Sequence, residues 1–454
     1  MDNSKTASGQ AASKRGLLIN RDFTLLWSAQ AISKLGDVVF DYTLVFWIAT
    51  SIAREQRWAP LAVSGIFVAT ALPTLAAGPI AGVFVDRWQK RPTMLLMDAL
   101  RAILLLLLLL ATGILPPPFQ LPPFGQLVAI YLVVVLATIC AQFFDPSRLA
   151  LVGDMVTEPD RAHATGLLEV TRNLAVVVGP PVAALLYFRF GALWALIINA
   201  LSFVVSFLAL LAVHASPSAV RPQTEQQTHF LREFVSGLHF LAGNRVLMTI
   251  LVTSVVGMFG FSAFSALGIF FALQNLHIPA SLSSFLSLAF GVGAMMGAFL
   301  AGLFAQRIGV ARTFWLSILL LSGLLLVYAR QTSFAPAVVV SFLFGIPYAA
   351  IGVASDPLLL HVTPRTLIGR IFSVIITIVM LSILVSTALV GYLASTVLHD
   401  FHARFLGLAF GPIDTIFTVG SLFGLLAGMY AMVNLWGLHL AREEDGPVFG
   451  PPRT

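Results

Sequence analysis

The sequence predicts an all-α membrane protein whose twelve transmembrane helices form two six-helix bundles. The composition is the first observation behind this prediction, because 58% of the 454 residues are hydrophobic and only 10% are charged. Soluble domains have about 25% charged residues. A chain of this length with so few charges cannot cover its surface with polar groups, so we expect most of it to lie in a lipid bilayer.

Apolar segments of membrane-spanning length are the second observation. A helix needs about 20 apolar residues to cross the hydrocarbon core, and the chain contains twelve such segments. Each is predicted to form one helix. Their approximate limits are 23–50, 60–86, 93–115, 126–149, 164–188, 191–213, 246–274, 281–305, 311–329, 334–360, 368–397 and 412–440.

A polar break divides these spans into six and six. Residues 215–228 are rich in Ser, Pro, Gln and Thr, which is typical of a linker. Residues 229–244 have the apolar spacing of an amphipathic helix, expected on the inner membrane face, with partner binding as the alternative. The predicted regions are a tail (1–22), an N-terminal bundle (23–214), a linker (215–245), a C-terminal bundle (246–440) and a second tail (441–454).

A repeat between the two halves is the third observation. The segment Gly82–Arg91, which follows the second span, is echoed by Gly302–Arg312 after the eighth span, at an offset of 220 residues. Asp145-Pro146 and Asp356-Pro357 form a second echo, after the fourth and tenth spans. Parallel repeats of six spans are one of the known plans of transporters.

The distribution of basic residues predicts the orientation. Of the 26 Lys and Arg residues, 18 fall in the tails, loops and span ends on the side of the N-terminus (with Arg148, Arg312 and Arg370 at the span ends), five fall in the opposite loops, and Lys34, Arg101 and Arg172 lie deeper inside spans. Cytoplasmic loops carry an excess of Lys and Arg. We therefore expect a multi-pass protein of the bacterial plasma (inner) membrane with both termini in the cytoplasm. The basic residues form no stripe, so we expect no nucleic-acid partner.

No enzyme site emerges from the sequence. The chain lacks the P-loop pattern Gly-x-x-x-x-Gly-Lys-Ser/Thr, and its histidines lack the spacing of metal ligands. We therefore expect a protein that is not an enzyme and that binds neither a metal nor a cofactor. Transport would have to draw its energy from an ion gradient, and the proton gradient is the expected source.

The repeated loop also carries a resemblance to a known family. The pattern Gly82-x-x-x-Asp86-Arg87-x-x-Lys90-Arg91 is similar to the signature of the major facilitator superfamily between its second and third spans. Asn20-x-x-Phe23 followed by Ser33-x-Leu35-Gly36-Asp37, and the turn Phe144–Arg148, resemble the branch of macrolide-efflux proteins and the enterobactin exporter, which are drug:proton antiporters. The resemblance covers roughly residues 20–440 and implies a cavity that opens alternately to the two sides.

In that superfamily the acidic residue of the signature faces the N-terminus of the eleventh span when the inner gate is shut. The resemblance gives this role to Asp86, and helix dipoles favour such a carboxylate. Arg87, Lys90 and Arg91 would hold the loop through lipid or carboxylates, or would only set topology. In the second copy, which contains Gly302, Gln306 and Arg307, a glutamine stands where a carboxylate is expected. An asymmetric inner gate is therefore expected.

The fifth span resembles the signature of the superfamily's exporters. Gly166, Ala175, Gly179, Pro180 and Ala183 occupy its positions, with Ala replacing Gly at two of them. Small residues allow close helix packing. The resemblance implies export by antiport, and the alternative is a proline-bent packing helix without meaning for direction.

Charged residues inside the spans predict a wet interior. Lys34, Asp37 and Asp41 share one helical face, and Glu169 and Arg172 form another i, i+3 pair. Charges at membrane depth usually face a cavity or a partner. Asp37 and Asp41, and after them Glu169, are the candidates for the proton-carrying group, and the alternative is a static ion pair. For Asp98 and Arg101 the structural role is favoured.

Aromatic residues near the middle of the membrane are candidates to contact substrate. Phe40 and Trp47 flank the charged face of the first span, and Phe261 and Phe264 lie at the corresponding level of the seventh. Core packing or lipid contact is the alternative for each.

The sequence as a whole predicts a proton-coupled exporter of amphipathic small molecules, working as a monomer in a lipid bilayer. An exporter of one metabolite or siderophore, or a lysophospholipid flippase, is the second hypothesis. A non-transporting membrane receptor or scaffold is the hypothesis from another class.

Overall fold

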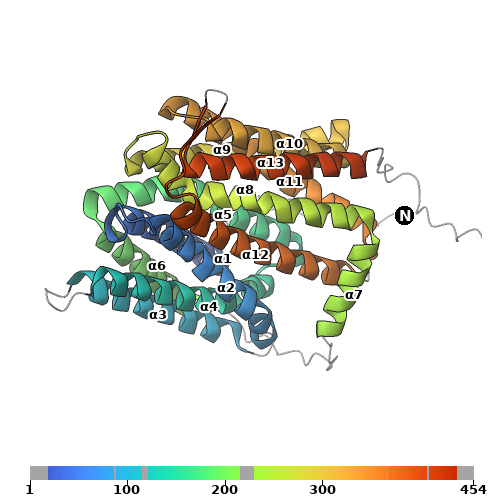
Figure 1. Ribbon diagram of the computed structural model, residues 1–454. Coiled ribbons are helices and arrows are strands. Elements are labelled where there is room, and N and C mark those ends of the chain that lie inside the picture. The colour runs from blue at the N-terminus through green and yellow to red at the C-terminus, as the bar shows by residue number, and fades with distance from the viewer. Residues whose placement is uncertain are drawn as a thin grey trace, which may run out of the picture.

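The computed structural model describes residues 19–85, 88–114, 121–214, 230–365, 367–405 and 408–436. Twelve of its helices are long and apolar enough to cross a membrane, so the predicted fold class is confirmed (Figure 1). The spanning helices are α1 Arg21–Trp47, α2 Ala59–Val85, α3 Lys90–Leu109, α4 Pro123–Met155, α5 Arg161–Phe190, α6 Ala192–Ala212, α8 Arg245–Gln274, α9 Ala280–Ile308, α10 Val310–Ala329, α11 Phe334–Val362, α12 Ile368–Tyr392 and α13 Pro412–Leu435.

Short elements complete the fold. Three of these helices continue into, or are followed by, a π-helical turn (η1 Ile48–Ile52, η2 Leu110–Ile114, η4 Leu393–Val397), and a 3₁₀ turn, η3 Glu158–Asp160, precedes α5. Strands β1 Ala403–Phe405 and β2 Leu408–Phe410 form an antiparallel pair between α12 and α13, which the sequence does not predict. Three-residue strands are too short for an alternating pattern to stand out.

Helix α4 is longer than its predicted span. Its 33 residues make it about 50 Å long, more than the hydrocarbon thickness. The helix therefore continues past residue 149 into the membrane boundary. Arg148 lies inside this helix, at the inner end of the predicted span 126–149.

Helix α7, Phe230–Gly243, occupies the segment with the amphipathic pattern. Figure 1 shows it running across one end of the bundle. It packs against α12, where a Cβ at Gly237 would lie 3.2 Å from the Arg370 carbonyl oxygen. Leu241 is fully buried in a cluster shared with α8, α10, α11, α12 and α13. The helix is thus attached to the C-terminal half.

The two halves meet through helices that the repeat relates. In each half the second helix packs against the fifth of the other: α2 contacts α12, and α9 contacts α5. Close approach at these contacts needs small residues, since a Cβ on Gly391 of α12 would lie 2.6 Å from Ser64 Cβ, and one on Gly291 of α9 would lie 2.8 Å from Val177 Cγ2.

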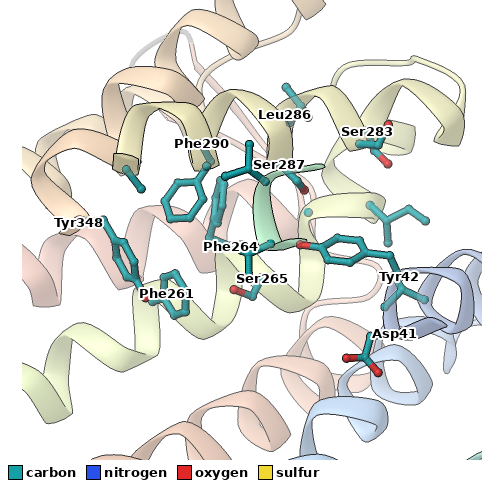
Figure 2. Close-up of a pocket in the computed structure, with 18 of the residues that line it drawn as sticks. Asp41, Tyr42, Phe261, Phe264, Ser265, Ser283, Leu286, Ser287, Phe290 and Tyr348 are labelled. Atoms are coloured by element: carbon teal, nitrogen blue, oxygen red, sulfur yellow. The ribbon is translucent and has the colours of Figure 1, made fainter. Parts of the chain in front are cut away.

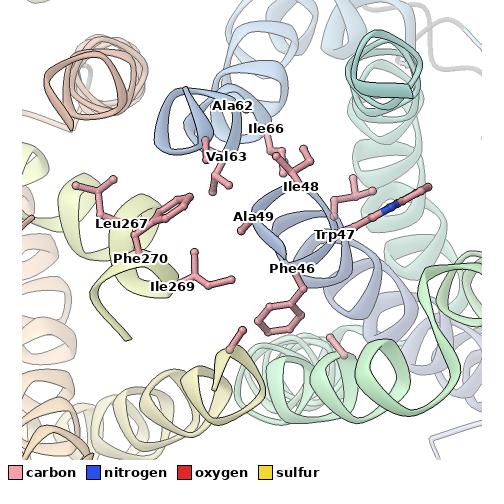
Figure 3. Packing of buried hydrophobic residues seen from close by; sticks show 14 of the residues in the cluster. Phe46, Trp47, Ile48, Ala49, Ala62, Val63, Ile66, Leu267, Ile269 and Phe270 are labelled. Atoms are coloured by element: carbon pink, nitrogen blue, oxygen red, sulfur yellow. The ribbon is translucent and has the colours of Figure 1, made fainter. Parts of the chain in front are cut away.

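The two ends of the bundle differ in how the halves are joined. We call the end that holds Asn20, α7 and Trp436 the inner end, following the predicted orientation. At the outer end one continuous apolar cluster contains residues of both halves, including Ala62 and Val63 of α2 and Leu267 and Phe270 of α8 (Figure 3). At the inner end the described residues form two separate clusters, one in each half. The halves therefore share one apolar core at the outer end, whereas at the inner end the described residues give each half its own apolar core.

Candidate functional site

A cavity of ≈ 590 Å³ lies between the two halves. Helices α1, α2 and α5 of the N-terminal half and α8, α9, α10 and α11 of the C-terminal half line it. Ile66 and Ile269 belong both to its lining and to the outer apolar cluster, so that cluster forms the outer boundary of the cavity. The volume lies in the usual range of small-molecule sites.

The C-terminal wall of this cavity is aromatic and uncharged. Phe261 stacks on Tyr348 with ring centroids 4.7 Å apart and planes 14° apart, and Phe264 lies 5.4 Å from Phe290. Figure 2 shows these rings gathered on one side of the cavity with serine side chains among them. The described lining residues of the C-terminal half include no charged side chain. Such a wall suits apolar and aromatic groups.

The N-terminal wall carries the charges, Asp41 on α1 and Arg172 on α5. Asp41 is exposed to the cavity, on the side opposite the aromatic rings (Figure 2). Among the described residues no basic nitrogen lies within 4.0 Å of its carboxylate. Asp41 is therefore a carboxylate that faces the cavity without a direct ion pair.

The aromatic residues predicted to line the cavity fall into two groups. Phe261 and Phe264 line it, whereas the expectation for Phe40 and Trp47 is wrong. Both are buried in the outer apolar cluster. A helix turns about 100° per residue, so Phe40 and Trp47 share one face of α1 that points roughly 100–120° away from Asp41.

Asp37 is held in an ion-pair network inside the N-terminal half. Its Oδ2 lies 3.9 Å from Lys34 Nζ and 4.0 Å from Arg101 Nη1. Arg101 also pairs with Asp98 at 2.7 Å, and the Asp98 side chain is fully buried. Asp37 and Asp41 therefore differ in surroundings: two cations flank Asp37, and no cation among the described residues contacts Asp41.

Two aromatic rings and two polar side chains complete this network. The Arg101 guanidinium lies 4.5 Å from the Phe144 ring centroid and 4.4 Å from that of Phe203. Ser206 donates a 2.5 Å hydrogen bond to Asp98 and accepts one of 2.7 Å from Gln30. The sequence places Asp98 and Arg101 one turn apart, but it carries no signal that Arg101 reaches Asp37 on another helix.

A second, smaller cavity of ≈ 150 Å³ lies between α1, α4 and α5. Arg172 lines both cavities, which makes them neighbours. Lys34, Arg148 and Glu169 also line the smaller one. Arg172 pairs with Glu169 at 2.8 Å, as the i, i+3 spacing predicts, and both side chains are well exposed.

Comparison with known protein families identifies the family of this chain. The family model described as Major Facilitator Superfamily matches residues 31–387, which is most of the chain. This chain belongs to the Major Facilitator Superfamily. It is therefore a multi-pass membrane transporter, and the alternative of a receptor or scaffold has no support from this match.

Relatives and solved structures agree with that membership. The chain is 23% identical to macrolide efflux protein A of Streptococcus pyogenes over 63% of its length and 67% of the relative's. It is 24% identical to the multidrug efflux pump Tap of Mycolicibacterium fortuitum over 78% and 85% of the two chains. The nucleoside transporter NupG has the same fold, with a TM-score of 0.70 at 12% identity over 92% and 100% of the chains.

The signature loop of the superfamily lies at the inner end. Asp86 and Arg87 fall outside the described residues, so their gate role stays a prediction. Lys90 lies 2.5 Å from Asp154 at the end of α4. Arg91 donates hydrogen bonds of 2.8 and 2.7 Å to the carbonyl oxygens of Leu210 and Leu211. It thus binds the C-terminal turn of α6, where cations are favoured.

Among the described residues, the second copy of the loop makes no contacts like those of Lys90 and Arg91 in the first copy. Gly302 lies on α9, where an added Cβ would meet no atom within 4 Å, and Gln306 and Arg307 are exposed in the last turn of that helix. Gly82, the corresponding glycine of the first copy, lies near the end of α2.

The exporter-like residues of α5 pack mainly inside the N-terminal half. Ala175 and Ala183 are buried, and a Cβ at Gly179 would collide with Val38 of α1. Pro180 is buried within a helix that is continuous from Arg161 to Phe190. Gly166 is in open space. The pattern thus allows α5 to approach α1 closely.

Proposed function

We propose that this transporter exports amphipathic small molecules from the bacterial cytoplasm in exchange for protons. It would act by alternating access, as a monomer in the plasma (inner) membrane with both termini in the cytoplasm. It would not be an enzyme, would need no cofactor, and would take its energy from the proton gradient. The relatives named as macrolide and multidrug efflux proteins support export over uptake.

The observation that carries the proposal is the division of the central cavity. An aromatic wall on α8, α9 and α11 offers apolar contacts, and Asp41 faces it from α1 with no direct cation partner among the described residues. Aromatic surfaces bind apolar groups with little directional demand. A carboxylate inside a wet cavity can gain and lose a proton as its surroundings change.

The seal at the outer end supports alternating access. With the inner end open, substrate enters from the cytoplasm and contacts the aromatic wall. The outer seal between α2 and α12 then has to part, including the hydrogen bond of 2.9 Å from the Leu61 amide to Ser395 Oγ and the exposed ion pair of Arg57 and Asp400 at 3.6 Å. Protonation of Asp41 from the outside and its deprotonation inside would couple this cycle to the proton gradient.

Proteoliposomes test the proposal. With an inward-directed proton gradient, the protein should drive the export of a macrolide or an amphipathic dye, and lumenal pH should change with substrate flux. Asp41→Asn should lower gradient-driven transport at least tenfold while exchange of substrate without a gradient persists. Glu158→Gln, in an exposed turn, is the matched control. Full gradient-driven export by Asp41→Asn would exclude Asp41 as the proton carrier.

The charge of the smaller cavity supports a second candidate function, the export of one acidic compound. Basic side chains line the smaller cavity next to the central one, which favours a substrate with an acidic group. An exporter of one acidic metabolite or siderophore, or a lysophospholipid flippase, would use the same path.

A further inference from the structure

The smaller cavity between α1, α4 and α5 has a strongly one-sided charge. Three basic side chains line it, Lys34, Arg148 and Arg172, against one acidic side chain, Glu169. Asp37 and Asp145, the partners of Lys34 and Arg148, are not among the residues that line it. The surface that a bound group would meet is therefore cationic.

Lys34 has the weakest interactions of these three basic side chains. Its Nζ is 3.9 Å from Asp37, which is beyond hydrogen-bond distance, and among the described residues it donates no hydrogen bond. An ammonium group has three donors. These donors are free to bind an acceptor that enters the cavity.

The walls of this cavity are fixed by contacts that do not use the cations. Trp27 Nε1 donates a 2.9 Å hydrogen bond to Thr171 Oγ1, joining α1 to α5. Gln30 bonds Ser206 on α6. A pre-formed wall reduces the cost of ordering the site on binding.

The position of the cavity completes a site with two parts. Lys34 and Asp41 are seven residues apart on α1, which is about 10 Å along the helix axis. Arg172 joins the two cavities. A molecule with one acidic group and an apolar body could therefore place the acid by Lys34 and Arg172 and the body against the Phe261–Tyr348 wall.

We infer that the smaller cavity is a subsite for the anionic group, phosphate or carboxylate, of an amphipathic substrate whose apolar body occupies the central cavity. This inference rests on the proposed transport path and adds the substrate class. A volume of ≈ 150 Å³ is enough for one such group and leaves the remainder of the molecule to the larger cavity.

Binding to the protein in lipid nanodiscs tests the subsite. Four probes are compared by competition: lysophosphatidic acid, the monoacylglycerol of the same chain length, an alkyltrimethylammonium of that length, and a carboxylated fluorescein dye. Wild type should bind the two anionic probes at least fivefold more tightly than the neutral and cationic ones. Tight binding of lysophosphatidic acid alone identifies a subsite for a lipid headgroup. Tight binding of both anionic probes identifies a general anion subsite, and either result supports the inference.

Substitutions then locate the preference. Lys34→Met should weaken the binding of lysophosphatidic acid at least fivefold and leave that of monoacylglycerol within twofold, and Lys34→Arg should restore it. Arg161→Met, at the exposed start of α5, is the matched basic control and should change neither. A thermal unfolding midpoint equal to that of wild type shows that Lys34→Met is folded. If Lys34→Met does not fold, Arg172→Met is the second variant for the same test.

Three results would overturn the inference: no preference for anionic probes, preference for the cation, or an equal loss for charged and neutral probes in Lys34→Met. These results leave the proposed function intact if liposomes still export a neutral or cationic amphiphile against a gradient. If no probe is transported in a proton-linked way, the proposed function is wrong. A selective loss of lysophosphatidic acid binding in Lys34→Met would still establish the subsite in that case.

Discussion

The two halves of this transporter share a helix plan but differ in what they present to the cavity between them. The N-terminal half contributes Asp41 and Arg172 and encloses the network of Lys34, Asp37, Asp98 and Arg101 behind them. The C-terminal half presents stacked rings and serines to the same space. In this fold the repeat preserves the path of the chain, while the chemistry of each copy is free to diverge.

This difference predicts different consequences of mutation. Changes in the N-terminal half should act through charge, on proton coupling and on stability, because charges at membrane depth are costly when they lose their partners. Changes in the C-terminal wall should act through contact area, on affinity for the substrate, because its described lining carries no charge. Arg101→Met and Phe261→Ala test this contrast, and Gly179→Ala tests helix packing inside the N-terminal half.

The largest effect is expected for Arg101→Met. It would leave the fully buried Asp98 without its cation, and breaking a buried pair in this way costs about 3–5 kcal/mol. The free energy of unfolding in detergent micelles, from denaturant titration, measures the loss. Arg330→Met is the counterpart in the other half, where the ion pair with Asp414 is longer (3.2 Å) and the Arg330 side chain is 21% exposed, against 6% for Arg101. We expect a smaller loss there, and equal losses would contradict the contrast.

An intermediate effect is expected for Gly179→Ala. The added methyl group would collide with Val38 on α1, and overpacking of this kind costs about 1–3 kcal/mol. Gly166→Ala in the same helix is the control, since an added Cβ there meets no atom within 4 Å. It should be neutral or slightly stabilising. The melting temperature of each purified variant provides the comparison, and Val38→Ala should partly rescue Gly179→Ala. Equal melting temperatures for the two glycine variants would show that α1 and α5 tolerate the methyl.

The smallest effect is expected for Phe261→Ala in the aromatic wall. Phe261 lines the cavity, and contact of its ring with an aromatic group of the substrate is worth about 0.5–1.5 kcal/mol beyond buried area. Loss of that contact should raise the apparent KM for an aromatic substrate roughly twofold to tenfold. The number of protons moved per substrate should stay unchanged. Phe299→Ala, on the exposed face of α9, is the control. A change in proton stoichiometry for Phe261→Ala would break the division between the two halves.

Much of this organisation could be predicted from local pattern. Hydropathy located the twelve spans, and the i, i+3 spacing predicted the pairs Lys34–Asp37, Asp98–Arg101 and Glu169–Arg172. These features depend on the geometry of one helix, which the spacing of residues dictates. Phe261 and Phe264 line the cavity, whereas Phe40 and Trp47, at the corresponding level of the membrane, are buried in the outer apolar cluster. Level along a helix says nothing about the direction in which a side chain points.

The membrane class, the number of spans and the i, i+3 charge pairs follow from the amino-acid sequence alone, because bilayer thickness and helical spacing act on contiguous residues. The signature motif after the second span indicates the family. Three features come from the packing of the helices: Arg101 lies next to Asp37, Asp41 faces the aromatic wall, and basic side chains of three helices line a neighbouring cavity. Those contacts depend on how each helix is rotated about its axis and which neighbours it meets. That choice is made by packing among distant segments, which no local pattern records.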